Sequence, residues 1–352
     1  MGVINHDDVP RRRYDEASRF FAEMNRLKPE IPGSHVRMDL GIAGADFDNQ
    51  QAHKTCPMGL PAPMEDAILL HRHCHDQGIA CGFIHPEDDL TRLKVFYVPH
   101  WVMRKPEWTA RVEAFVAQGG TLILSALTGT RDLHNHIPMV QAPAMGLAEP
   151  AGGKVQEFGR LAAPDATGLF PPRPDRHVGA HVPGTLADAA SASRQYRFTL
   201  GNQEFTAARR YEKLALAQGT KVLGQWSTRC HEGTPAITAR SHGTGRVVYV
   251  GTYLTPELAA QPIEVVCAPA GVVPLLPNLP AGVEVSVRQP ADRTLYFIQN
   301  TTKAPASLSG VLAGTDLLTD RPVNGVLTLK AYGCDVIKVS KARHDKIMAP
   351  TD

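Results

Sequence analysis

Two carboxylates flank one aromatic residue directly after the first predicted strand. Asp46 and Asp48 lie on either side of Phe47, following a strand expected over 35–42. The carboxyl ends of strands are where an open α/β sheet tends to build its binding site, so both side chains are candidates for a ligand or interface contact. Residues i and i+2 on a loop point apart, however, and Asp after a strand commonly caps the next helix. Capping is the competing interpretation, and neither aspartate is assigned a catalytic role.

A serine and two histidines are the candidates for nucleophilic chemistry. Ser125 lies near the end of the buried strand predicted over 121–126, and His134 and His136 follow in DLHNHIP. A serine acts as a nucleophile only when a histidine is poised beside it, and sequence separation does not establish that contact. We therefore expect a structural rather than a catalytic Ser125.

The segment HRHCHDQG offers metal-binding side chains. His71 and His75 are four residues apart, which places them on one face of the helix predicted over 64–78. This spacing can hold zinc, but a third ligand is not evident from the sequence and the glutamate of an HExxH motif is absent. The glycine-rich run at 243–251 precedes a strand rather than a helix, so it does not predict a phosphate site. No metal or cofactor is expected.

Composition excludes several classes of protein. The 352 residues are 43% hydrophobic and 20% charged, with a formal net charge of +2, and the one basic cluster is Arg11–Arg13. Nucleic-acid binding calls for a larger basic face. No apolar run approaches the ~20 residues of a membrane span, and the N-terminus lacks the apolar core of a secretory signal. Six scattered cysteines without a CxxC pair indicate reduced thiols, so we expect a cytoplasmic protein.

Strands and helices alternate along the first two thirds of the chain. A first helix over 14–28 carries one apolar stripe that we expect to be buried. Then follow apolar strands and amphipathic helices at βαβ spacing: strands at 35–42, 79–85, 93–100 and 121–126, and helices at 64–78 and 106–120. This alternation predicts an α/β fold with an open, doubly wound, mostly parallel sheet. Antiparallel strands are expected over 194–214, and a hairpin over 235–251.

The remaining pattern divides the chain. Five prolines and few charges over 262–280 indicate a linker, and the evenly spaced short strands after it predict a small antiparallel β-sandwich. The expected domains are an N-terminal helix at 1–34, an α/β domain at 35–261, the linker at 262–280, the sandwich at 281–341 and a tail at 342–352.

Several segments in order resemble the β-galactosidases of glycoside hydrolase family forty-two. The segments are INHDDVPRRRYDEA near the N-terminus, ADFDNQQAH at 45–53, and the runs at 93–132, 221–254 and 315–339. Gln50 and Gln51 replace the aromatic pair that the family usually has after the Asn. The resemblance covers about residues 3 to 340. It implies an amidotransferase-like trimerisation domain followed by the C-terminal sandwich, and it places the N-terminus where the catalytic (β/α)8 barrel of the family would end.

The resemblance implies a scaffold without catalytic residues. Retaining glycoside hydrolysis needs two carboxyl groups ~5–5.5 Å apart, and both lie in the barrel of the family. Class I amidotransferases carry a nucleophilic Cys on the turn after the strand that corresponds to 121–125, and this chain has none there. We expect a homo-oligomer, suggested to be a trimer, in which the large aromatics Trp101 and Trp108 are candidate contacts. The alternative is that both indoles lie in the core of the α/β domain.

We therefore expect the chain to be a non-catalytic oligomerisation and accessory part of a β-galactosidase-like protein of carbohydrate metabolism. Hydrolysis would then require a separate catalytic barrel. The chain is a barrel-less relative, the remainder of a longer protein, or a separately made subunit. Two alternatives stay open. One is a residual glycoside hydrolase built on Asp46, Asp48 and nearby histidines. The other is a carbohydrate-binding module that presents Tyr296 or Tyr332 to a galactoside-type sugar, although Tyr332 is expected in the sandwich core.

Overall fold

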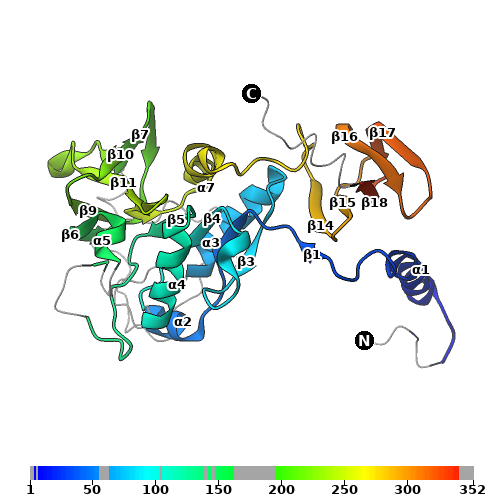
Figure 1. The fold of residues 1–352 in the computed structure, drawn as a ribbon, viewed down its shortest axis with the longest axis horizontal. Helices are drawn as coiled ribbons and strands as arrows, with labels where there is room; N and C mark the ends of the chain where they lie inside the picture. Colours follow the sequence, from blue (N-terminus) through cyan, green and yellow to red (C-terminus); the bar gives the residue numbers. More distant parts are fainter. Residues whose placement is uncertain are drawn as a thin grey trace. The chain divides into compact units, whose positions relative to one another are not determined.

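The computed structural model describes residues 4, 7–54, 63–103, 105–137, 142–143, 147–161 and 196–340. The chain forms two compact units (Figure 1). The first contains Met1–Arg37, Cys74–Ala80 and Pro274–Asp352, and the second contains Met38–His73 and Cys81–Val273. The expected tail at 342–352 and the whole segment at 162–195 lie outside the described residues.

A nine-stranded sheet forms the second unit, in the order β3-β2-β4-β5-β12-β11-β10-β7-β8. Its first five strands pair in parallel and the other four pair antiparallel. The parallel strands are β2 (Leu40–Ala43), β3 (Cys81–Ile84), β4 (Val95–Val98), β5 (Thr121–Ser125) and β12 (Gly245–Val250). The antiparallel strands are β7 (Arg197–Leu200), β8 (Gln203–Thr206), β10 (Lys221–Trp226) and β11 (Pro235–His242). The fold is mixed α/β.

Continuous apolar runs explain the parallel half. Every residue of β2, β4 and β5 is buried, as expected of strands covered on both faces. Helix α4 (Pro106–Ala117) begins at a proline in its first turn and packs on β5 and β12. The other helices of this unit are α2 (Phe47–Lys54), most of α3 (Pro63–Asp76), α5 (Ala148–Ala151) and α7 (Pro256–Gln261). The buried cluster between α4 and the sheet includes Phe96, Phe115 and Tyr249.

A separate three-stranded antiparallel sheet completes the second unit. Its order is β13-β9-β6, formed by β6 (Gly153–Arg160), β9 (Ala208–Leu216) and β13 (Thr252–Tyr253). It carries the buried pair Arg210 and Glu212, whose Nε and Oε1 are 2.6 Å apart. Oε2 of Glu212 accepts a hydrogen bond from the Tyr249 hydroxyl at 2.7 Å, so this ion pair joins the small sheet to β12 of the large one.

One connected antiparallel sheet forms the bulk of the first unit, in the order β1-β14-β15-β18-β16-β17. Its strands are β1 (His35–Val36), β14 (Val283–Gln289), β15 (Arg293–Asn300), β16 (Ala306–Asp316), β17 (Pro322–Leu329) and β18 (Cys334–Ser340). The antiparallel prediction is confirmed, but the strands form a single sheet rather than two facing ones. Tyr296 is buried in this unit, whereas Tyr332, expected in the core, is 65% exposed at a positive-φ turn position.

Helix α1 (Arg12–Leu27) forms where the periodicity predicts it, but its apolar stripe is not buried. Phe20 is 56% exposed and Phe21 is 63% exposed, and Met24 is also exposed. Of the apolar side chains on this helix only Leu27 is buried, because within the described residues nothing covers the rest of the stripe. The expectation of a buried stripe is wrong for this chain, although the residue pattern is that of a packing face.

Two predicted segments differ in detail. The strand expected over 35–42 is two strands, because β1 pairs with β14 in the first unit and β2 pairs with β3 and β4 in the second. The segment expected to be a linker at 262–280 begins with helical turns at Pro262–Cys267 and Ala268–Ala270, in which Val266 and Cys267 are buried. Proline is compatible with the first turn of a helix, so a proline-rich composition did not exclude these turns.

Candidate functional site

Charged side chains from the segments that follow β2, β3 and β4 meet at the carboxyl ends of these strands. Nζ of Lys105 lies 3.6 Å from Oδ1 of Asp46 and 3.1 Å from Oδ2 of Asp48. Nε2 of His85 lies 4.0 Å from the same Oδ1 of Asp46, and its Nδ1 lies 3.9 Å from Oε2 of Glu87. We call Asp46, Asp48, His85, Glu87 and Lys105 the Lys105 cluster. The expectation that Asp46 and Asp48 point apart is wrong, because one ammonium group holds both carboxylates.

Asp46 caps helix α2. Its Oδ2 accepts hydrogen bonds from the backbone N of Asn49 at 2.8 Å and from Nδ2 of Asn49 at 3.0 Å. Oδ1 of Asn49 in turn accepts from the backbone N of Met103 at 2.8 Å, which ties α2 to the loop after β4. Asp46 is only 8% exposed. The capping interpretation is confirmed, and Asp46 is poorly placed to touch a ligand directly.

Lys105 keeps its charge at neutral pH. Burial of Lys105 opposes the charged form, but the hydrogen bond with Asp48 and the negative charges of Asp46 and Asp48 outweigh it and raise the pKa of Lys105. The ammonium also lies 4.6 Å from the centre of the Trp108 ring, a cation–π contact. A permanently charged lysine that already bridges two carboxylates forms an ion-pair network. It does not form the acid and nucleophile pair that glycoside hydrolysis requires.

Trp101 and Trp108 are buried next to the Lys105 cluster and do not form an exposed contact surface. They are 4% and 2% exposed, and their rings lie 4.9 Å apart in the core under α4. Nε1 of Trp108 donates to Oε1 of Glu87 at 2.9 Å, and His85 stands edge-on to the Trp108 ring at 4.8 Å. Of the two interpretations of these indoles, the core position is the one that the structure shows, because buried rings offer no area to a partner.

A shallow hollow borders the Lys105 cluster. It measures about 490 Å³ and is lined by Phe47, Asp48, Met103, Lys105 and Leu133, among others. Phe47 is 73% exposed and Leu133 is 48% exposed. Large apolar side chains beside a charged pair are typical of the surfaces that proteins use for association. Phe47 and Leu133 were not singled out by sequence reasoning, and only the position of Phe47 between two aspartates could have signalled it.

Ser125 does not face a catalytic histidine. Its Oγ accepts a hydrogen bond from the backbone N of His100 at 2.6 Å and donates to the carbonyl of Val98 at 3.1 Å. His134 lies in the exposed loop after β5, as does His136. The sequence-based expectation of a structural Ser125 is confirmed, because its hydroxyl holds backbone groups at the ends of β4 and β5.

A buried histidine and aspartate lie beside Ser125, and sequence reasoning missed both. Nε2 of His100 is 2.7 Å from Oδ2 of Asp66, and Nδ1 of His100 is 2.8 Å from the carbonyl of Ala126. The ring stacks on Tyr253 with centroids 3.6 Å apart. A serine, a histidine and an aspartate are the residues of a catalytic triad. Here, however, the two imidazole nitrogens contact Asp66 and the Ala126 carbonyl rather than the Ser125 hydroxyl, and His100 is fully buried. The network is structural.

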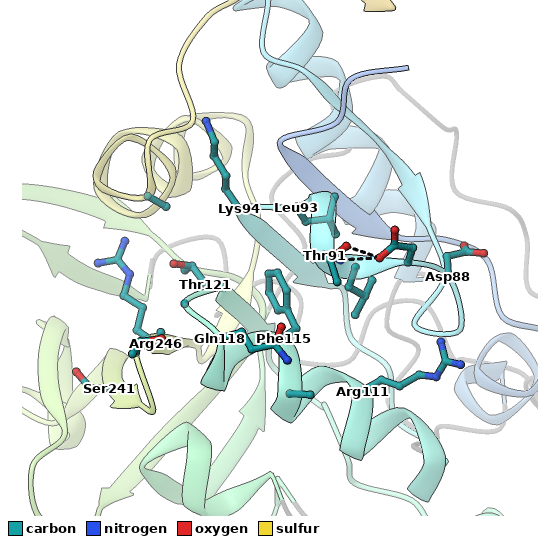
Figure 2. A pocket seen from close by; sticks show the side chains of 18 of the residues that line it. Asp88, Thr91, Leu93, Lys94, Arg111, Phe115, Gln118, Thr121, Ser241 and Arg246 are labelled. Carbon is teal, nitrogen blue, oxygen red and sulfur yellow. Dashed lines mark hydrogen bonds between the residues drawn. The ribbon is translucent and has the colours of Figure 1, made fainter. Parts of the chain in front are cut away.

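A second hollow lies at the opposite, amino ends of the strands (Figure 2). It measures about 770 Å³ and is lined by three cations, Lys94, Arg111 and Arg246, among other residues. Each cation already donates a hydrogen bond to a backbone carbonyl oxygen. Lys94 donates to Gly271, Arg111 donates to Glu87, and Arg246 donates to Val266. Since these charges serve the fold, and since α/β sheets bind ligands at the other edge, we assign no ligand to this hollow.

Comparisons with known proteins agree with this picture of a scaffold. Residues 62–272 match the family model described as the β-galactosidase trimerisation domain, and residues 282–338 match that of the β-galactosidase C-terminal domain. β-Galactosidase BgaA of Planococcus sp. is 23% identical over 336 residues, which are 94% of this chain and 45% of that protein. β-Galactosidase LacZ of Heyndrickxia coagulans is 26% identical over 86% of this chain and 41% of that protein.

Solved structures share the fold. The crystal structure of a β-galactosidase from Bacillus circulans sp. alkalophilus superposes with a TM-score of 0.80 at 23% identity, covering 96% of this chain and 47% of that one. A second structure is that of a catalytic mutant of Gan42B, a family forty-two β-galactosidase from G. stearothermophilus. It superposes with a TM-score of 0.78 at 19% identity, covering 97% of this chain and 46% of that one. The chain thus spans about half the length of the curated relatives and solved structures that it matches.

Proposed function

This chain belongs to the family of the β-galactosidase trimerisation domain, and we propose that it is a non-catalytic oligomerisation and accessory part of a β-galactosidase-like protein. Hydrolysis of a galactoside then depends on a catalytic barrel outside the 352 residues. One observation carries the proposal: the matches assign 62–272 and 282–338 to the trimerisation and C-terminal domains, while the chain covers 45% of a relative named β-galactosidase.

The uncovered face of α1 supports a further domain as partner. Phe20 and Phe21 stack edge to face at 5.7 Å and are more than half exposed, and Met24 extends the same apolar surface. Exposed large aromatics side by side on one helix are a typical docking surface, because their burial releases ordered water over a large area. We propose that the catalytic barrel packs here, as the resemblance of this segment to the barrel exit implies.

The surface beside the Lys105 cluster supports contact between copies of the chain. Phe47 is the most exposed of the large hydrophobic side chains in the described residues, at 73%. Asp48 and Lys105 form a charged rim next to it. An apolar anchor with a polar rim is the usual anatomy of an interface. We propose a three-fold assembly through this surface, in which Asp48 is a contact and Asp46 acts through its cap on α2.

Finer features of the proposal come from the same resemblance. The parallel half of the large sheet, with helices packed against it, supports a doubly wound, class I amidotransferase-like origin of the domain. Cys81, Cys230, Cys267 and Cys334 form no disulfide with one another, which supports a cytoplasmic location. None of the described helices combines the length and the apolarity needed to cross a bilayer.

The oligomer is tested by measuring mass in solution. Light scattering coupled to size exclusion should give about three times the 38.2 kDa chain mass. Phe47→Ser should shift the protein toward the monomer, whereas Val222→Ser, which removes an exposed apolar side chain from β10, should leave the mass unchanged. A wild-type monomer at every concentration would overturn the oligomerisation proposal. An unchanged mass for Phe47→Ser would overturn the assigned surface.

A further inference from the structure

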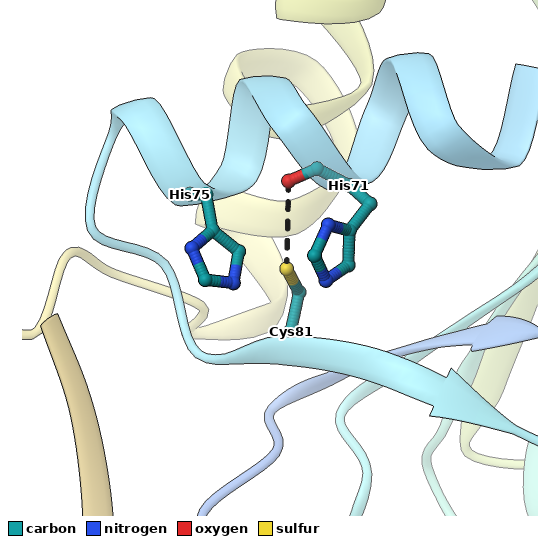
Figure 3. A group of neighbouring side chains, drawn as sticks. All are labelled: His71, His75 and Cys81. Atoms are coloured by element: carbon teal, nitrogen blue, oxygen red, sulfur yellow. Dashed lines mark hydrogen bonds between the residues drawn. The ribbon is translucent and has the colours of Figure 1, made fainter. Parts of the chain in front are cut away.

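Three side chains of metal-binding type converge where helix α3 returns into strand β3. One ligand atom from each of His71, His75 and Cys81 lies within 4.8 Å of the other two (Figure 3). The sequence indicated the two histidines, but the third ligand was hidden because it lies on the next element. The three residues fall within 71–81, so helix α3, one turn and the start of β3 fix their arrangement.

Local structure explains the convergence. His71 and His75 project from successive turns of α3, as residues four apart do. The turn is closed by hydrogen bonds from the backbone N of Gly78 to the carbonyl of His75, at 2.9 Å, and from Ile79 to Cys74, at 2.8 Å. Gly78 has a φ of +65°, the left-handed conformation in which glycine commonly ends a helix. The chain therefore runs back under the histidines and brings Cys81 between them.

Contacts within the protein hold two of the three ligand side chains. The imidazole of His71 stacks on the ring of Phe83 with centroids 4.9 Å apart and an interplanar angle of 15°. Sγ of Cys81 lies 3.8 Å from the carbonyl oxygen of His71. All three side chains are half-buried, so an ion could reach them from solvent while most of their surroundings stay fixed.

We propose that His71, His75 and Cys81 bind a divalent zinc-type cation. Tetrahedral zinc with Zn–N of ~2.0–2.1 Å and Zn–S of ~2.3 Å separates its ligand atoms by roughly 3.3–3.6 Å. The ligand atoms of the three residues lie within 4.8 Å of one another, and small side-chain rotations bring them to these shorter separations. Two neutral imidazoles and one thiolate suit zinc and cobalt better than magnesium or calcium, which prefer oxygen. Binding releases the Cys81 thiol proton to solvent, and water completes the fourth position.

Cobalt titration of the metal-free full-length chain tests this site. Wild-type protein stripped with chelator should bind one Co²⁺ per chain and develop the absorption band of thiolate-to-cobalt charge transfer. Equimolar ZnCl2 should bleach the band. Cys81→Ser should abolish the band, and His71→Ala combined with His75→Ala should weaken Co²⁺ binding at least tenfold.

Matched controls separate this site from chance binding. His73→Ala removes a histidine from the same helix but not from the cluster, and it should bind Co²⁺ as the wild type does. Cys230→Ser and Cys334→Ser remove exposed thiols elsewhere and should keep the band. Far-ultraviolet circular dichroism shows whether each variant is folded, and His75→Gln serves if the double variant is not. Absence of stoichiometric binding by the wild type, or a band that survives in folded Cys81→Ser, would overturn the proposal.

Discussion

Protonation of His53 is expected to destabilise the second unit in mild acid. His53 lies on α2, is 5% exposed, and has Nε2 3.4 Å from the hydroxyl of Tyr253. Burial, and then the nearby charge of His100, lower the pKa of His53 from 6.5 to about 4. The neutral imidazole is therefore the form that the folded chain accepts, whereas the unfolded chain takes up a proton readily below pH 6.5.

The sign and size of the effect follow from this difference. Because the unfolded state binds more protons between the two pKa values, the His53 contribution is complete above about pH 6.5 and is lost as the pH falls toward 4. With a folded pKa of about 4, the free energy of unfolding should fall by about 2.5 kcal/mol between pH 7.5 and pH 4.5 through this residue alone.

Tryptophan fluorescence isolates this unit, because Trp101, Trp108 and Trp226 all belong to it. Urea unfolding is followed at several pH values for the wild type, for His53→Gln, which stays neutral, and for His134→Gln, which replaces an exposed histidine. The stability difference between wild type and His53→Gln should shift by about 2.5 kcal/mol in favour of the variant as the pH falls to about 4.5. Parallel pH profiles for these two proteins would refute the reasoning, as would an equal shift in His134→Gln.

Further perturbations address the other assigned residues. Asp46→Ala removes the cap on α2 and should lower the free energy of unfolding by about 1 kcal/mol in urea titrations, whereas Val222→Ser on the surface of β10 should cost about 0.5 kcal/mol or less. Glu212→Gln leaves the buried Arg210 guanidinium without its counter-ion and should cost about 3–5 kcal/mol in the same assay; a loss below about 1 kcal/mol would contradict the assignment. Replacing Phe20 and Phe21 by Ser should leave unfolding nearly unchanged, because both are exposed, yet should weaken binding of a family forty-two barrel in a pull-down.

Long apolar runs made the parallel half of the sheet predictable. Leu40–Ala43, Val95–Val98 and Thr121–Ser125 are buried along their whole length, so composition alone identifies them as central strands. Helices were expected at 64–78 and 106–120, and the structure places α3 at Pro63–Asp76 and α4 at Pro106–Ala117. The pairing of strands was harder to predict from the sequence. The two halves of 35–42 pair with different strands, in different units, through contacts that are distant in the sequence.

The site was predictable only in part, because its partners are distant in the sequence. Asp46 and Asp48 could be named from their place after a strand, but Lys105, which holds both, is more than fifty residues away. His100 and Asp66 contact each other through the same kind of long-range packing. The exposure of Phe20 and the burial of Trp108 could not be separated by sequence, since both have the pattern of a packing face and differ only in what covers them.

Hydrolysis of a chromogenic β-galactoside by the purified 352-residue chain tests the central claim most directly. The account predicts no turnover above a buffer blank, and turnover on addition of a family forty-two catalytic barrel that is itself weakly active. Two results together would contradict the account: hydrolytic activity that copurifies with the chain when no barrel is added, and loss of that activity in a folded Asp48→Asn variant.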